Sequence, residues 1–126
     1  MRRFLWICLA GAVGSGARYL VGLWTVERLG AGFPYGTLIV NIAGCFSIGA
    51  LMHVALSQGW PVTLRAALTV GFLGGFTTYS SFNYETTRLL ESGAVRAASM
   101  NVLLTLFGGL AAGWLGLVLA RQIAGR

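Results

Sequence analysis

The sequence predicts an all-α membrane protein with four transmembrane helices. Of its 126 residues, 56% are hydrophobic and only 10% are charged, whereas a soluble domain carries roughly 25% charged residues. The apolar residues form four runs, each near the ~20 residues that a helix needs to span the hydrocarbon core. We therefore expect one domain over residues 1–126, with spans at about 4–26, 35–56, 64–90 and 97–120.

The charges favour a membrane surface over nucleic acid. The net charge is +6, and all nine basic residues are arginines that occur singly or in pairs. Most of them flank apolar runs, where arginine anchors to lipid head groups, and they form no basic tract of the kind that binds nucleic acid. One histidine and three glutamates supply neither a nucleophile–base pair nor a metal cluster, so we expect no enzyme.

The first span begins like a secretory signal, MRRFLWICLAGAVG. The apolar character resumes after Arg18 and three more spans follow, so we expect this segment to remain as the first span. Cys8 and Cys45 lie within apolar runs without metal-ligand spacing, which is typical of small buried hydrophobes. The joints ERLGAGFP, SQGWPVT and ESGAVR carry Gly or Pro with polar residues, as loops do.

Four spans place both termini on one side of the membrane. Orientation follows an excess of Lys and Arg on the cytoplasmic side, and here the terminal side has five arginines against three. This small excess leaves two interpretations open: one fixed orientation, or insertion both ways with pairing to an inverted copy. The five are Arg2, Arg3, Arg65, Arg121 and Arg126, and the three are Arg28, Arg88 and Arg96.

Polar residues within the first two spans are candidates for function, because they are costly at membrane depth. Arg18 lies about two-thirds of the way along its span, where it either snorkels to the interface or gives a vestibule a positive potential that draws anions. Asn41 belongs to a slanting stripe of residues four apart. Its amide suits helix packing and donation into a pore equally well. The stripe comprises Thr37, Asn41, Cys45, Gly49 and His53.

The fourth span is rich in small residues. Gly109 and Gly113 make a small-xxx-small pair, which is typical of close helix packing in membranes. Asn101 and Thr105 are its main polar side chains past the start. Packing is the expected role of this span.

The third span contains the most unusual segment, GFLGGFTTYSSFNYE over residues 71–85. Gly74 and Gly75 are weak points in a helix, and the neighbouring hydroxyls can bond freed backbone groups; such interruptions occur where protein or an aqueous cavity surrounds them. Freed carbonyls can coordinate a hard cation, and donors can face an anion. Tyr79 and Phe82 share a face, and their ring edges carry partial positive charge. The alternative is a packing kink with aromatic filler.

Three motifs in register resemble those of the Fluc (CrcB) fluoride channel family. GGFTTYSSFNYE resembles the family's third-span signature, usually Gly-Gly-Leu-Thr-Thr-Phe-Ser-Thr-Phe-Ser-x-Glu. GAVGSGARYL in the first span and PYGTLIVNIAG at the start of the second agree in order and position. The resemblance covers essentially the whole chain.

This resemblance implies a fluoride-selective passive channel that lets cytoplasmic fluoride leave and so reduces its toxicity. It implies a multi-pass protein of the bacterial inner membrane that assembles as an antiparallel, dual-topology homodimer with two pores. It also implies a central structural sodium ion, held at the dimer interface by backbone carbonyls in the interrupted third span. Fluoride, sodium, membrane lipid and a second copy of the chain are thus the expected partners.

The resemblance also assigns residues. Asn41 is the expected pore donor of the second span, and Tyr79 and Phe82 stand where the family has two phenylalanines, with Ser81 or Ser80 as the hydroxyl between them. We add Thr105 of the fourth span to the predicted pore. The sodium carbonyls map to Gly74 and Thr77, the vestibule arginine to Arg18 and the motif carboxylate to Glu85.

The chain departs from the family pattern in two places. Tyr79 replaces the first phenylalanine, so a hydroxyl stands in or beside the expected path. Gly109 and Gly113 stand where the fourth span often carries serine or threonine.

Two other functions compete with a channel. A small four-span proton-coupled exporter of cationic compounds needs a membrane-buried carboxylate, for which Glu85 is the only candidate. A subunit that only packs against other helices predicts that Asn41 and Phe82 tolerate apolar replacement without a transport defect.

Overall fold

The computed structural model of the chain describes residues 1–124, so Arg126 lies outside the described residues. All regular elements in this range are helices, as the sequence predicts. They are α1 (Arg2–Leu29), α2 (Tyr35–Ser57), α3 (Val62–Ala66), the π-helical η1 (Ala67–Leu73), α4 (Gly74–Phe76), α5 (Tyr79–Glu91), α6 (Val95–Leu103), the π-helical η2 (Leu104–Gly108) and α7 (Gly109–Ala124).

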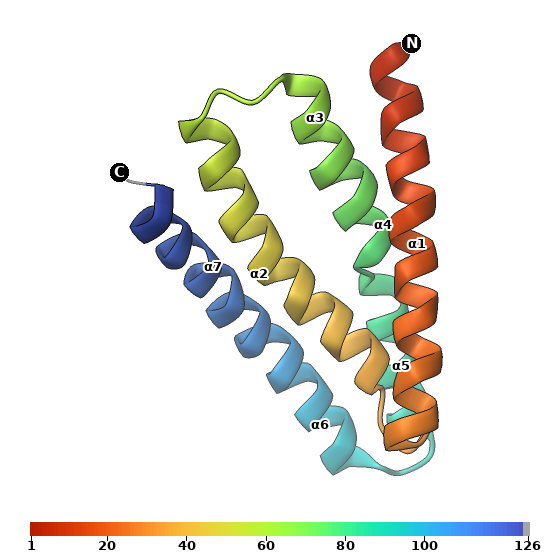
Figure 1. Cartoon of the computed structure of the whole chain (residues 1–126). Coiled ribbons are helices and arrows are strands. Elements are labelled where there is room, and N and C mark those ends of the chain that lie inside the picture. Colours follow the sequence, from red (N-terminus) through yellow and green to blue (C-terminus); the bar gives the residue numbers. More distant parts are fainter. Residues whose placement is uncertain (125–126) are drawn as a thin grey trace.

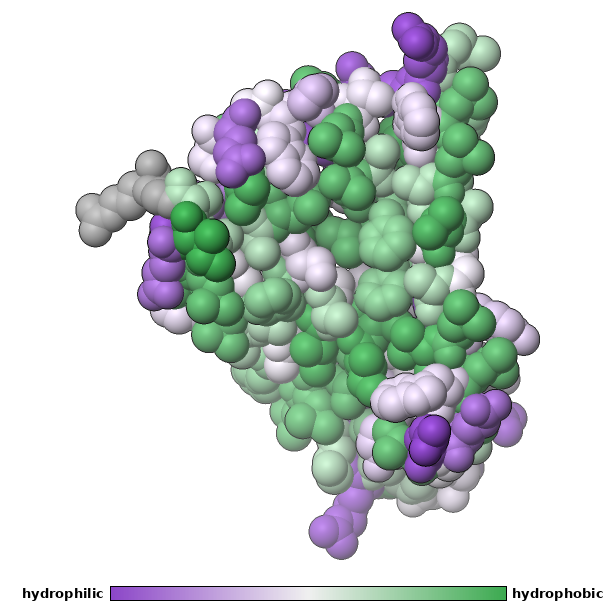
Figure 2. Space-filling model, in the orientation of Figure 1, coloured by the Kyte–Doolittle hydropathy of each residue, from purple (hydrophilic) through white to green (hydrophobic). Residues whose placement is uncertain are grey.

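Three helical stretches are long and apolar enough to cross a membrane: Arg2–Leu29, Tyr35–Ser57 and Val95–Ala124, the last formed by α6, η2 and α7 in succession. Apolar side chains cover the middle of the molecular face in Figure 2, and hydrophilic ones gather toward its two ends. This distribution is the one expected for helices surrounded by lipid. The prediction of an α-helical membrane protein is confirmed.

The helices turn back at short loops, so that α7 ends at the same end of the bundle where α1 begins (Figure 1). Gly30 follows α1 with a φ of 81°, and Gly93 follows α5 with a φ of 77°. These angles lie in the left-handed region, which glycine adopts without steric penalty and which commonly ends a helix.

The helices α2 and α7 lie side by side along most of their length (Figure 1). A Cβ atom added to Gly116 would lie 2.2 Å from the Phe46 carbonyl oxygen, and one on Gly49 would lie 2.2 Å from the Gly113 carbonyl oxygen. Only glycine permits this approach of two backbones, as small residues do at membrane helix interfaces. We call Gly49, Gly113 and Gly116 the glycine seam.

The third segment of the chain leaves helical geometry at Thr77 and Thr78. Thr77 has φ −89° and ψ 158°, and Thr78 has φ −154° and ψ 119°, which are extended values. Gly74 and Gly75, the weak points suggested by the sequence, remain helical within α4. A Cβ on Gly75 would lie 2.4 Å from the Gly11 carbonyl oxygen of α1, so this glycine serves close packing.

Candidate functional site

Asn41 of α2 holds the non-helical backbone of the third segment. Its Nδ2 donates to the Thr78 carbonyl oxygen at 2.9 Å, and its Oδ1 accepts from the Thr78 N–H at 2.8 Å. The side-chain amide thereby satisfies two backbone groups that are costly to leave unpaired in lipid. Because Nδ2 carries two hydrogens, one remains that can face an ion.

Thr78 begins α5 as its N-cap, and its Oγ1 accepts from the Ser81 N–H at 3.2 Å. The same hydroxyl donates to Ser81 Oγ at 3.1 Å and lies 3.2 Å from Ser80 Oγ. Three hydroxyls therefore meet at this helix start. Thr78 was missing from the predicted site, although a hydroxyl residue three positions before a helical N–H is a known capping signal.

The carbonyls of Gly74 and Thr77 are predicted to bind sodium. The N–H groups that would donate to them in an α-helix donate to other acceptors here. In an α-helix the Gly74 carbonyl accepts from Thr78 and the Thr77 carbonyl from Ser81, four residues on. Here the Thr78 N–H bonds to Asn41 and the Ser81 N–H bonds to Thr78 Oγ1. Both carbonyls are thus released from helical pairing with these donors.

The two aromatic residues of the motif stand together at the start of α5. The ring centroids of Tyr79 and Phe82 are 5.7 Å apart with planes inclined at 48°, and Tyr79 is 80% exposed. Across from them on η2, Thr105 Oγ1 is buried and has no hydrogen-bond partner among the described residues.

Five of the predicted site residues line one cavity. This hollow has a volume of about 400 Å³ and lies between α2, α4, the start of α5 and η2; we call it the central cavity. It brings three of the predicted pore residues together with the two residues whose carbonyls are predicted to bind sodium, whereas Phe82, Ser80 and Ser81 do not line it. The five are Asn41, Gly74, Thr77, Tyr79 and Thr105.

Arg18 lines a separate cavity of about 370 Å³, which we call the Arg18 cavity. Thr37, Thr78 and Ser81 also line it, so the one cation of the first span's interior faces the hydroxyls at the start of α5. Ser80, by contrast, lies on the exposed side of α5 and reaches the site through its contact with Thr78.

Glu85 is held by Thr37, a stripe residue that the predicted site did not include. Thr37 Oγ1 donates to Glu85 Oε1 at 2.8 Å, while Glu85 Oε2 is buried without a hydrogen-bond partner among the described residues. Both residues line a third cavity of about 520 Å³, together with Arg88. The four-residue spacing from Thr37 to Asn41 was the signal that could have identified Thr37.

Comparison with known proteins decides the family. The model of the CrcB-like protein, Camphor Resistance (CrcB) family matches residues 5–117. The chain belongs to the CrcB family. The family assignment made from the three motifs is confirmed.

Similar proteins share almost the full length of the chain and are named "Fluoride-specific ion channel FluC". The protein from Anaeromyxobacter dehalogenans is 48% identical over 99% of this chain and 100% of its own length. The protein from Geobacter metallireducens is 50% identical over 93% of this chain and 95% of its own length. The protein from Sorangium cellulosum is 48% identical over 98% of this chain and 98% of its own length. With its membrane-length helices, this CrcB chain is a multi-pass bacterial membrane protein.

Proposed function

We propose that this CrcB protein is a passive, fluoride-selective channel that lets cytoplasmic fluoride leave the cell. The observation that carries the proposal is the shared name of relatives that match 93–99% of the chain at 48–50% identity. Their printed name gives fluoride as the specific ion. A proton-coupled exporter of cationic compounds is not favoured by these relatives.

The central cavity has the chemistry that fluoride requires. Fluoride is small and strongly hydrated, so a selective path replaces its water with donors and still releases the ion. The second Asn41 hydrogen, the Thr105 hydroxyl and the ring edge of Tyr79 are such donors on this cavity. The Phe82 ring does not line the cavity but lies against the Tyr79 ring. None of these groups brings a fixed positive charge. Ser81 and Ser80 add hydroxyls at the start of α5.

Two ionisable residues complete the proposed pathway. Arg18 gives its cavity a positive potential beside Thr37, Thr78 and Ser81, and such a potential raises the local concentration of anions. The hydrogen bond from Thr37 fixes the orientation of the Glu85 carboxyl group. Arg18 thereby recruits fluoride. The hydrogen bond from Thr37 controls where the Glu85 oxygens lie relative to the fluoride path.

The proposal includes an antiparallel homodimer with two pores, in which the interrupted third segment is the fourth membrane crossing. Gly74 is exposed, and a Cβ added to it would meet only the Thr69 carbonyl oxygen, at 3.8 Å. A second copy of the chain can therefore approach this turn closely.

We place a sodium ion at this interface, bound by the carbonyls of Gly74 and Thr77 from both subunits. Hard cations prefer oxygen ligands, and these carbonyls have lost their usual helical donors to Asn41 and Thr78. The cation would supply positive charge near the two pores and offset repulsion between anions.

The direct test is anion efflux from liposomes that contain the purified protein, read with fluoride and chloride electrodes. Fast fluoride release with chloride release no greater than from empty liposomes is the expected result. Fluoride release no faster than from empty liposomes, from protein verified as a dimer in sodium, would count against a channel.

Sodium and dimerisation have their own tests. Fluoride flux is expected to fall when sodium is replaced by a large organic cation during purification and reconstitution; equal flux in both conditions would remove the sodium ion from the account. Cross-linking between protomers is expected to give a dimer in detergent and in lipid.

A further inference from the structure

A buried pair of hydrogen bonds links α6 to the turn of α5 that carries Phe82. Asn101 of α6 is only 1% exposed, and its Nδ2 donates to Thr86 Oγ1 at 2.9 Å. The Thr86 hydroxyl in turn donates to the Phe82 carbonyl oxygen at 2.7 Å. A side chain of α6 thus reaches the backbone of a predicted pore residue through one intermediate. We call Asn101, Thr86 and the Phe82 carbonyl the α5–α6 relay.

The relay gives the Thr86 hydroxyl a single direction. A threonine that bonds back to the carbonyl four residues earlier competes with the helical hydrogen bonds and often bends the helix. Because Thr86 Oγ1 accepts a hydrogen from Asn101, its own hydrogen is left for the Phe82 carbonyl. A hydroxyl that accepts one bond also donates more strongly. The geometry at the start of α5 therefore depends on a side chain of α6.

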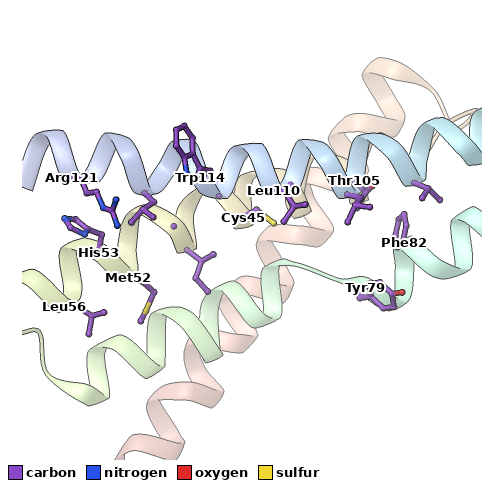
Figure 3. A pocket seen from close by; sticks show the side chains of 17 residues that line it. Cys45, Met52, His53, Leu56, Tyr79, Phe82, Thr105, Leu110, Trp114 and Arg121 are labelled. Carbon is purple, nitrogen blue, oxygen red and sulfur yellow. The ribbon is translucent and has the colours of Figure 1, made fainter. Parts of the chain in front are cut away.

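The Phe82 ring lies where its orientation affects an anion. A groove of about 1070 Å³ runs along α2 and α7, and Phe82 and Thr105 line one end of it (Figure 3). Tyr79 and Thr105 line both this groove and the central cavity, and the Phe82 ring lies against that of Tyr79. An aromatic ring attracts an anion at its edge and repels it at its face, so a small rotation of the ring changes this attraction.

Stability alone is a poor account of Asn101. Its Oδ1 is buried and has no hydrogen-bond partner among the described residues, and such an atom offsets much of what the bond from Nδ2 contributes. An apolar side chain would pack α6 against α5 without that cost. What it would lose is the bond that orients the Thr86 hydroxyl.

We propose that Asn101 is a positioning residue of the pore, which acts through Thr86 on Phe82 and does not itself touch the ion. The inference rests on the proposed channel function. Asn101 and Thr105 stand four residues apart, about one helical turn, so the helix that presents Thr105 to the central cavity also orients the aromatic turn of α5. The competing role is helix pairing alone, in which Asn101 only joins α6 to α5.

The test records fluoride current through single channels in planar lipid bilayers. The current through one open channel does not depend on how much of the protein folds, so a purely structural role would leave it unchanged. The variants are Asn101→Leu, Thr86→Val and the two combined. Thr87→Val is the matched control, because Thr87 Oγ1 donates to the Asn83 carbonyl oxygen at 3.0 Å on the exposed side of α5. Each variant is first shown to elute as the same dimer as the unmodified protein.

We expect Asn101→Leu and Thr86→Val each to lower the single-channel conductance about fivefold, the equivalent of one net hydrogen bond. Thr86→Ser keeps the hydroxyl and is expected to keep the conductance, and Thr87→Val should leave it unchanged. The double variant is expected to conduct like Thr86→Val alone, because both changes interrupt the same relay and their effects do not add.

Three outcomes overturn the proposal while leaving the channel function intact: unchanged conductance in Thr86→Val, an equal loss in Thr87→Val, or losses that add in the double variant. Thr86→Val decides by itself if Asn101→Leu yields no dimer. Absence of fluoride current from the unmodified protein defeats the channel function itself, and with it this inference.

Discussion

The glycine seam and the turn at Thr77–Thr78 hold helices together in opposite ways. At the seam, α2 and α7 approach until the Cβ position of Gly116 is 2.2 Å from a backbone oxygen. At the turn, α2 reaches the third segment through the side chain of Asn41, which makes two hydrogen bonds to Thr78. One contact depends on the absence of side chains and the other on a polar side chain.

This difference indicates which of the two regions can bind an ion. Close-packed backbones at the seam exclude anything between them, so the seam contributes stability and shape. The turn leaves hydrogen-bonding capacity: the second Asn41 hydrogen, the released carbonyls and the Thr105 hydroxyl, which has no partner among the described residues. Unused capacity at membrane depth is expensive, which is a reason to expect a function there.

The largest expected effect is at the seam. Gly116→Ala places a Cβ against the Phe46 carbonyl oxygen, so the two backbones must separate, at a cost of about 1–3 kcal/mol. We expect a lower thermal midpoint and a lower yield of folded protein in detergent. Gly16→Ala is the control, because a Cβ there meets nothing within 4 Å. Equal midpoints for the two variants would mean that the seam is not tightly packed.

The second prediction concerns Thr78, which joins the two halves of the third segment. Thr78→Val keeps the shape but removes the hydroxyl that accepts from the Ser81 N–H, and loss of such a cap costs about 1 kcal/mol. We expect a several-fold loss of fluoride efflux, because Ser80 and Ser81 also lose their common partner. Thr78→Ser retains the cap and should conduct normally; a conducting Thr78→Val would show that the hydroxyl cluster is dispensable.

The helices were predictable from the sequence because lipid imposes a simple rule on length and hydrophobicity. The position of the turn was harder to predict. Glycine propensity points to Gly74 and Gly75, yet the extended residues are Thr77 and Thr78. The reason is tertiary: Asn41 captures the Thr78 backbone from 37 positions away, and no local pattern encodes that pairing.

Site residues that belong to a family motif could be predicted from the sequence. Residues whose role depends on a hydrogen-bond partner in another helix could not. Thr37 was visible only as a member of a stripe, and its bond to Glu85 depends on how α2 packs beside α5. Thr105 lies on the π-helical η2, which packs against α2, and no local sequence pattern marks a π-helix there.

The third prediction tests the Thr37–Glu85 bond. Thr37→Val is close in volume and removes the donor to Glu85 Oε1, so the carboxyl group loses its fixed orientation. We expect a moderate reduction of fluoride efflux, about threefold to tenfold, corresponding to about 1 kcal/mol for one hydrogen bond. Recovery in Thr37→Ser would attribute the loss to the hydroxyl, and normal efflux in Thr37→Val would show that the orientation of Glu85 is immaterial.

The smallest effect is expected for Tyr79→Phe. The Tyr79 side chain is 80% exposed, and its contact with Phe82 is made by the ring. Removing the hydroxyl keeps the ring edges, so fluoride efflux should change by less than about threefold, which is below the effect of one net hydrogen bond. A tenfold change in either direction would make the hydroxyl itself part of the ion path.

The most direct test of the account compares fluoride efflux from liposomes that contain the unmodified protein and the Asn41→Leu variant. Asn41→Leu removes both bonds to Thr78 and the remaining donor. If the polar turn conducts fluoride, the variant's initial rate falls at least about tenfold, the equivalent of one lost charge-assisted hydrogen bond, while both proteins remain dimeric. Equal fluoride rates from two intact dimers would contradict the account, because fluoride would then cross without the side chain on which the site depends.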